Sequence, residues 1–170
     1  MMSAGPGAYY LMSAYAVALM LEHGGGLIVG LTDLVVDDGK GRDADDIAAD
    51  AGYEGQGQLL WDLSHQCINR LMASMAAETR KKKIAVVTLM PGFMQTERVL
   101  RHLTSDEVKK MFRFDLSEST EYVGRAVVAL AADKKVMRHS GHIRFVADLA
   151  REYGFTDIDG RVVPRFKPFG

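Results

Sequence analysis

The sequence predicts an α/β fold in which a parallel sheet of about three strands carries helices on both faces. Three apolar runs have the length of strands, at residues 27–31, 84–90 and 142–146. Segments with apolar residues at helical spacing separate each run from the next. Strands that alternate with helices favour parallel pairing, because a helix returns the chain to the end at which the next strand begins.

The first two elements are a helix over residues 8–22 and a strand over residues 27–31. The helix segment is rich in Ala, Leu and Met and contains no Gly or Pro. Its apolar side chains lie on nearly every side, so we expect the sheet and another subunit to cover it. Three glycines at 24–26 end this helix, and the short apolar run after them predicts a buried strand.

Residues 34–57 combine many carboxylates with many glycines and predict an acidic loop insertion, with one helical turn near 44–50. Clustered carboxylates can bind a hard cation. Their spacing does not match a calcium-binding EF-hand loop, however, and the histidines show no metal-ligand spacing. A solvated loop is the expectation, no metal ligands are assigned, and a metal or small-ligand site in this loop is the alternative.

The second half of the chain continues the alternation. A long helical pattern over 59–80 leads to the strand at 84–90, and an amphipathic segment over 97–117 follows. Within this segment Ser105 and its neighbours predict a helix start. A further helix over 117–132 precedes the last strand at 142–146, and the tail over 147–170 is expected to be irregular.

The most informative motif is Pro91-Gly92-Phe93-Met94-Gln95-Thr96, directly behind the strand at 84–90. Pro91 ends the strand because it lacks an N–H group and restricts the residue before it. Gly92 permits a close backbone approach. Thr96 places a hydroxyl beyond the carboxyl end of a strand, which is where open α/β sheets bind ligands. The alternative for Thr96 is a cap for the next helix.

Composition restricts the classes of partner. The chain has 170 residues and a net charge of −1, which gives no electrostatic reason to expect nucleic acid or an anionic membrane. Cys67 is the only cysteine, which excludes an internal disulfide and suits a reducing, cytoplasmic location. The apolar run at 8–21 is too short for a membrane span.

Five motifs follow one another along the chain. They are Gly-Leu-Ile-Val-Gly-Leu-Thr-Asp at 26–33, Trp-Asp-Leu-Ser-His at 61–65, Pro-Gly-Phe-Met-Gln-Thr-Glu at 91–97, Glu-Tyr-Val-Gly-Arg-Ala at 121–126 and Leu-Ala-Arg-Glu-Tyr-Gly-Phe-Thr-Asp at 149–157. With these residues in view, the chain resembles the short-chain dehydrogenase/reductase family over about residues 7–160, which match the C-terminal part of such an enzyme. The resemblance implies a single, partial Rossmann-like domain, an NAD or NADP cofactor and an alcohol or carbonyl substrate. It places Pro91, Gly92, Phe93 and Thr96 at the nicotinamide end of the cofactor and makes 97–117 a substrate lid.

The family's catalytic positions are occupied by unusual residues. Its catalytic Tyr and Lys correspond to Trp61 and His65, and its Ser falls near Thr32 or Asp33. An indole has no accessible pKa, so Trp61 cannot give a proton to a carbonyl and recover it. A histidine is only partly charged near neutral pH, unlike a lysine. Thr32 could orient a substrate oxygen, whereas an anionic Asp33 would repel a developing oxyanion.

Three alternatives remain at these positions. Tyr53 could replace the missing tyrosine from within the acidic loop. Trp61 could be a packed aromatic residue, and His65 could be a hydrogen-bonded helix histidine.

The sequence also lacks the Gly-rich pyrophosphate turn of the family, so the N-terminal half of the fold is expected to be missing. A start at Met1-Met2 inside an apparent domain suggests a fragment, a misplaced start or a partial chain. The strand at 27–31 is then expected to be an open apolar edge. Two functions follow: a dehydrogenase/reductase that is truncated or non-catalytic, and an interaction subunit. The subunit would form a homo-oligomer or pair with a full-length relative through helices 8–22 and 59–80.

Overall fold

The computed structural model describes residues 3–32 and 59–166. They form a parallel three-stranded sheet in the order β1 (Gly26–Leu31), β2 (Ile84–Met90) and β3 (Ile143–Phe145). The predicted strands and their parallel pairing are therefore confirmed, but the expected burial of the first strand is wrong: only Gly30 of β1 is buried, because β1 lies at the edge of the described sheet. The acidic loop expected at 34–57 lies outside the described residues.

The central strand β2 holds the sheet together because it pairs with both neighbours. β1 lies beside β2 over its whole length, from Gly26 opposite Ile84 to Leu31 opposite Leu89. β3 meets only the last part of β2, where Thr88 lies opposite Ile143. Six consecutive residues of β2, Ile84 to Leu89, are buried, which explains why this run is apolar on both faces.

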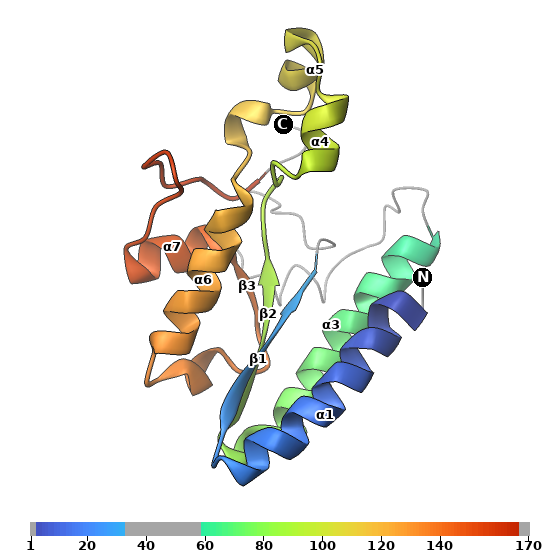
Figure 1. The fold of residues 1–170 in the computed structure, drawn as a ribbon, viewed down its shortest axis with the longest axis vertical. Coiled ribbons are helices and arrows are strands. Elements are labelled where there is room, and N and C mark those ends of the chain that lie inside the picture. The colour runs from blue at the N-terminus through green and yellow to red at the C-terminus, as the bar shows by residue number, and fades with distance from the viewer. Residues whose placement is uncertain (1–2, 33–58, 167–170) are drawn as a thin grey trace.

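Helices cover both faces of the sheet (Figure 1). On one face, α1 (Ala8–Glu22) and α3 (Leu59–Thr79) pack against a core that includes Ile84 and Val86. On the other face, α6 (Thr120–Ala132) and α7 (Val146–Tyr153) enclose a core around Val87 and Leu89. β2 therefore contributes alternate side chains to two separate cores.

The helix α1 agrees with the predicted range of 8–22, and Tyr9 fixes it to β1. The Tyr9 hydroxyl donates to the Leu31 carbonyl and accepts from the Leu31 amide, both at 3.1 Å. Gly30 makes this packing possible, because a Cβ there would meet the Met72 methyl at 2.7 Å and the Tyr9 ring at 3.0 Å. Within the described residues β1 pairs with β2 alone, so its outer edge has no neighbouring strand.

The predicted helix at 59–80 is α3, which passes directly into the 3₁₀ turn η2 (Arg80–Lys82). The helix expected over 117–132 is confirmed as α6, although it begins three residues later, at Thr120. No helix in the described ranges 3–32 and 59–166 combines the length and apolar character needed to cross a bilayer.

The amphipathic segment 97–117 is divided into short elements. These are α4 (Glu97–His102), α5 (Asp106–Met111) and the 3₁₀ turn η3 (Phe114–Leu116). The helix start expected at Ser105 is confirmed, because the Ser105 hydroxyl accepts from the Val108 amide at 3.3 Å.

The irregular tail expected over 147–170 is wrong in its first part, because Val146–Tyr153 form α7 directly after β3. Its buried residues Val146, Leu149 and Ala150 follow helical spacing. Gly154, with a φ of 74°, ends the helix in the left-handed conformation.

The last turn of α7 is held by a polar cluster that includes η4 (Val136–His139). Tyr153 donates to Asp133 at 2.7 Å, and its hydroxyl lies 3.0 Å from the buried His139 Nε2. Arg138 and Arg144 pair with Glu152 at 2.7 and 3.0 Å. These contacts fix the C-terminal helix against the sheet.

Candidate functional site

The candidate site lies at the carboxyl ends of β1 and β2. The loop at 91–96 leaves β2 here, Thr32 follows β1, and α3 begins at this same end of the molecule (Figure 1). The Thr32 amide donates to the Leu89 carbonyl at 3.0 Å, so Thr32 is fixed beside the end of β2. The topology thus assembles two of the predicted site segments at one sheet edge.

The loop at 91–96 is clamped to the start of α6. Met94 and Glu118 form an isolated parallel bridge. In this bridge the Glu118 amide donates to the Phe93 carbonyl at 3.0 Å, and the Gln95 amide donates to the Glu118 carbonyl at 2.8 Å. The loop is therefore held by backbone hydrogen bonds on both sides of Met94.

Gly92 allows a close approach, as expected, but the group that comes close belongs to the protein itself. A Cβ at Gly92 would lie 2.8 Å from Oε2 of Glu118 and 3.5 Å from the Phe166 Cβ. Glycine is required here because the Glu118 carboxyl fills the space that a side chain would occupy.

Thr96 is a helix cap. Its hydroxyl oxygen accepts from the Val99 amide at 3.3 Å, in the first turn of α4. The cap alternative is confirmed, and the cofactor contact stays a prediction. The two roles are compatible, because a hydroxyl that accepts one hydrogen bond can still donate its own proton.

Phe93 belongs to an aromatic stack. Its ring centroid lies 6.2 Å from that of Phe112 and 5.6 Å from that of Phe166, with interplanar angles of 21° and 29°. The stack links the loop to the end of α5 and to the C-terminal segment. Phe93 therefore supplies an apolar wall beside the loop.

Of the predicted catalytic positions within the described residues, Thr32 is the one with a buried, unpaired polar atom. Its side chain is 2% exposed, and Oγ1 has no hydrogen-bond partner among the described residues. A buried hydroxyl without a partner is costly, so it fits a bound group that presents a donor or acceptor. Asp33 and the alternative Tyr53 lie outside the described residues.

Trp61 and His65 form a pair on α3. Their ring centroids are 4.5 Å apart, and His65 Nδ1 lies 2.9 Å from the Trp61 carbonyl oxygen, to which it donates as the Nδ1–H tautomer. The interpretation of His65 as a hydrogen-bonded helix histidine is confirmed. Trp61 is 37% exposed and is not a core aromatic.

Glu118 is the site residue that the sequence did not reveal. It is 1% exposed, and one carboxyl oxygen has no partner among the described residues. Burial raises the pKa of Glu118 to about 7, a hydrogen bond from the Gly92 backbone opposes the rise, and Asp157 adds to it. A glutamate within Ser-Glu-Ser-Thr before a helix resembles an ordinary helix start, so no sequence pattern marks it.

The residues present fit the nicotinamide end of NAD(P) in their chemistry. The carbonyls of Phe93 and Met94 and the amide of Gln95 are already paired within the protein. The hydroxyl protons of Thr96 and Thr32 and the apolar Phe93 ring remain as the groups that a carboxamide and a flat ring can use. No cluster of three potential metal ligands occurs in the part of the chain that the structure describes.

Comparison with known proteins identifies relatives of this chain. No family model matches it. "Dehydrogenase/reductase SDR family member 1" of Homo sapiens is 32% identical over 162 residues, and the protein of that name from Mus musculus is 32% identical over 169. These alignments include 91% and 95% of this chain but only 47% and 49% of the relatives, so the chain spans about half their length.

Solved structures share the fold. A 7α-hydroxysteroid dehydrogenase complexed with NADH has a TM-score of 0.59 and 19% identity, over 81% of this chain and 49% of its own. A putative NAD(P)-dependent gluconate 5-dehydrogenase from Beutenbergia cavernae, with bound NADP, has a TM-score of 0.57 and 20% identity, over 82% and 51%. The Rossmann-like character of the sheet is thereby confirmed.

Proposed function

We propose that this chain, which is related to the short-chain dehydrogenase/reductase family, holds the nicotinamide end of NAD(P) without itself transferring hydride. The proposal depends on the contrast between the loop at 91–96 and the Trp61–His65 pair on α3. The loop at 91–96 is ordered and fixed by hydrogen bonds, whereas Trp61 and His65 occupy the positions of the family's proton-transfer pair.

The loop supports cofactor binding through its position and its rigidity. It follows the central strand at the carboxyl edge of the sheet, where α/β proteins bind nucleotides. Pro91 to Thr96 would contact the nicotinamide group, with Phe93 against a ring face and the Thr96 hydroxyl as donor. A loop that is already ordered loses little conformational freedom on binding.

The pair on α3 argues against turnover. A bound NAD(P)H supplies a hydride, and a carbonyl that receives it also needs a proton from the protein. Trp61 cannot supply one, because the indole N–H does not ionise in water. His65 donates to the Trp61 carbonyl through Nδ1, so a proton for the carbonyl would have to come from Nε2 of a charged imidazole, whereas the family uses a tyrosine and a lysine. Thr32 can orient an alcohol or carbonyl oxygen, but a threonine hydroxyl is not a general acid at neutral pH.

A titration with NADH or NADPH tests the cofactor site. Trp61 is the only tryptophan, so the tryptophan emission comes from one position in the chain, and it is corrected for the light that the added cofactor absorbs. We expect Thr96→Ala to weaken the affinity by about fivefold, the value of about one hydrogen bond. Ser105→Ala is the matched control, because it removes the same kind of cap from α5. Equal affinities for the Thr96 and Ser105 variants would refute the assignment of the loop.

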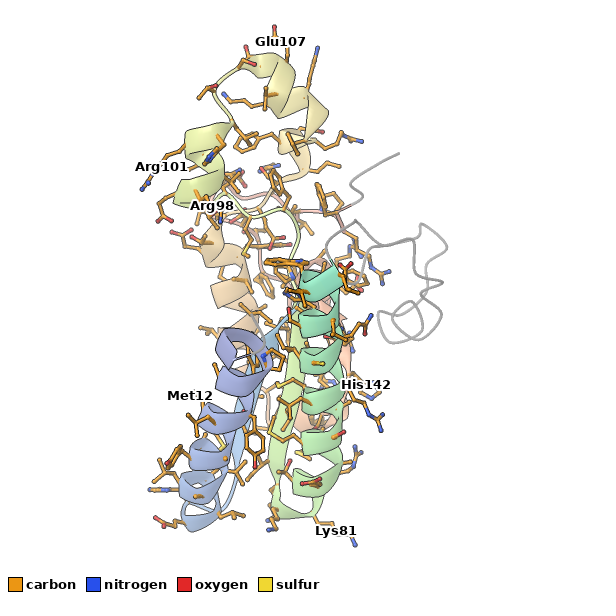
Figure 2. All side chains as sticks on the ribbon, turned by 90° about the vertical axis from the view of Figure 1, so that its right-hand side faces the viewer. Met12, Lys81, Arg98, Arg101, Glu107 and His142 are labelled. Atoms are coloured by element: carbon orange, nitrogen blue, oxygen red, sulfur yellow. The ribbon has the colours of Figure 1, made fainter. Side chains whose placement is uncertain are left out.

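A second candidate function, an interaction subunit, is favoured by the surface of α1. Large apolar side chains on this helix are exposed to between 43% and 69%, and Ser13 is its only buried residue. Figure 2 shows Met12 projecting from the side of α1 away from α3. In this role, α1 and α3 would join a second copy of the chain or a longer relative. The exposed set comprises Tyr10, Leu11, Met12, Tyr15, Leu19 and Leu21.

The remaining functional expectations stay proposals. The lone, half-buried Cys67 favours a reducing, cytoplasmic environment. A metal or small-ligand site in the acidic loop depends on residues 34–57, which lie outside the described residues.

A further inference from the structure

Glu118 joins the loop at 91–96 to the C-terminal end of the chain. Its backbone pairs with Phe93 and Gln95, and its side chain points under Gly92. The carboxyl is buried although no described cation forms an ion pair with it. An isolated carboxylate in such a position is costly, which favours the neutral acid.

The segment 157–166 passes beside the Glu118 carboxyl, and we call this segment the strap. In Figure 1 the red chain leaves α7 and turns back past the upper end of α6. The strap begins at Asp157, whose carboxylate accepts from the Ser119 amide at 2.8 Å and from the Ser119 hydroxyl. It ends at Phe166, which stacks on Phe93 and faces Gly92.

Between these two ends, the strap is tied to the protein at several points. Arg161 donates to the Asp115 carbonyl at 2.9 Å, and Arg165 forms hydrogen bonds with Asp148. Val163 is fully buried beside Tyr122. The strap is thus ordered from Asp157 to Phe166, and Glu118 lies where it meets the loop.

The charged and titratable groups around Glu118 come from three elements. The strap presents Asp157, which opposes ionisation of Glu118, and Arg161, which is directed at the carbonyls of Asp115 and Ser117. The helix α6 contributes Tyr122, and Arg125, whose guanidinium donates to the Thr156 and Asp157 carbonyls. From α7, Arg151 acts on Tyr122. Burial and Asp157 together disfavour a charge on Glu118 in this closed arrangement.

We propose that Glu118 is a protonation-gated positioning residue: as a neutral acid it keeps the strap closed on the loop at 91–96, and as a carboxylate it releases the strap. A carboxylate buried beside Asp157 lowers its free energy by reaching water, and the strap is the element whose movement admits water. Release of the strap should weaken NAD(P) binding, and this expectation rests on the proposed function. The reason is that Phe93, the ring proposed to contact the nicotinamide, then loses its stacking contact with Phe166.

The test follows the Gly92 amide and the Phe166 ring by NMR from about pH 5 to about pH 9. We expect both sets of signals to titrate together in the wild-type chain, with a midpoint at about pH 7. Glu118→Gln, which cannot ionise, should show neither titration. Glu121→Gln is the matched control, because its exposed carboxyl lies one turn away on α6, and it should titrate as the wild type does.

Titration of these signals in Glu118→Gln, or flat wild-type signals, would overturn the proposal. If Glu118→Gln does not fold, the side-chain carboxyl ¹³C signal of Glu118 in the wild type decides: it must titrate with the same midpoint as the Gly92 and Phe166 signals, and a different midpoint overturns the proposal. NADH affinity in the same samples should be about threefold tighter at low than at high pH in the wild type and in Glu121→Gln, and should not depend on pH in this way in Glu118→Gln. Absence of NADH binding with an intact NMR titration would refute the proposed function and leave the gate supported.

Discussion

At the residue scale, the loop at 91–96 depends on the pairing of a glycine with a buried acid. Gly92 is needed for space rather than for an unusual backbone conformation, because its φ is not among the positive values of the described residues. The sequence indicated that something approaches Gly92 closely, but it could not indicate what. Glu118 is 26 positions away, and only the packing of α6 against the loop brings the two together.

Substitution of Gly92 tests this pairing. We expect Gly92→Ala to lower the free energy of unfolding by about 1–3 kcal/mol, because the added methyl meets the Glu118 carboxyl at 2.8 Å. Gly124→Ala is the control, since nothing lies within 4 Å of a Cβ there and the site is an exposed turn of α6. That variant should gain up to about 1 kcal/mol from helix propensity. Denaturant unfolding of both variants would contradict the account if their effects were equal.

The raised pKa of Glu118 also makes stability depend on pH. The native state retains a proton up to about pH 7, whereas the unfolded carboxyl loses it near 4.5. Between about pH 4.5 and about pH 7 the native protein therefore binds more protons than the unfolded chain, and the contribution of Glu118 to the free energy of unfolding falls as the pH rises through this range. The full loss is about 3 kcal/mol.

The burial of His139 has the opposite effect on the pH dependence of stability. It lowers the pKa of the imidazole, so the unfolded chain binds this proton more readily and the free energy of unfolding decreases as the pH falls. The difference between wild type and Glu118→Gln isolates the carboxyl, since His139 is common to both. We expect that difference in unfolding free energy to shift by about 3 kcal/mol in favour of the glutamine variant between about pH 4.5 and about pH 8. A constant difference would show that Glu118 does not titrate with a raised pKa.

At the element scale, the sequence predicted the apolar runs that lie between turn signals and missed a helix that follows a strand without a loop. The run Ile84–Met90 and the helix Ala8–Glu22 were both predictable, because each is predominantly apolar and is followed by Pro or Gly. The helix α7 was not, because Val146 and Ala147 extend the apolar pattern of β3. Gly154 was an available end signal, and its left-handed conformation confirms its role.

The helix α1 is where association should be visible. We expect Tyr15→Glu to reduce self-association of the wild-type chain at micromolar concentration, because it places a charge within the exposed apolar set. Val128→Glu on α6 is the matched control, since Val128 and Tyr15 are both 69% exposed. Sedimentation velocity measures both. A stable wild-type monomer, or equal effects of the two variants, would contradict the interaction surface.

At the scale of the whole molecule, β1 presents an unpaired edge within the described residues, and α1 with β1 borders a cavity of about 400 Å³. Its lining includes Met12, Met20, Leu27 and Ile28. On this edge of β1, the Tyr9 hydroxyl pairs with the backbone of the last strand residue, Leu31. An apolar cavity beside an open strand is a surface suited to a further polypeptide.

The measurement that tests the central claim most directly is a titration of the purified chain with NADH, followed through Trp61, with hydride transfer to carbonyl compounds assayed in the same samples. We expect saturable binding at micromolar to millimolar concentration and no turnover by the wild type. Trp61→Tyr/His65→Lys, which puts Tyr and Lys at the two positions that the resemblance assigns to the family's catalytic pair, is the variant in which turnover would be gained. Wild-type turnover, or emission that does not change with NADH, would contradict the account.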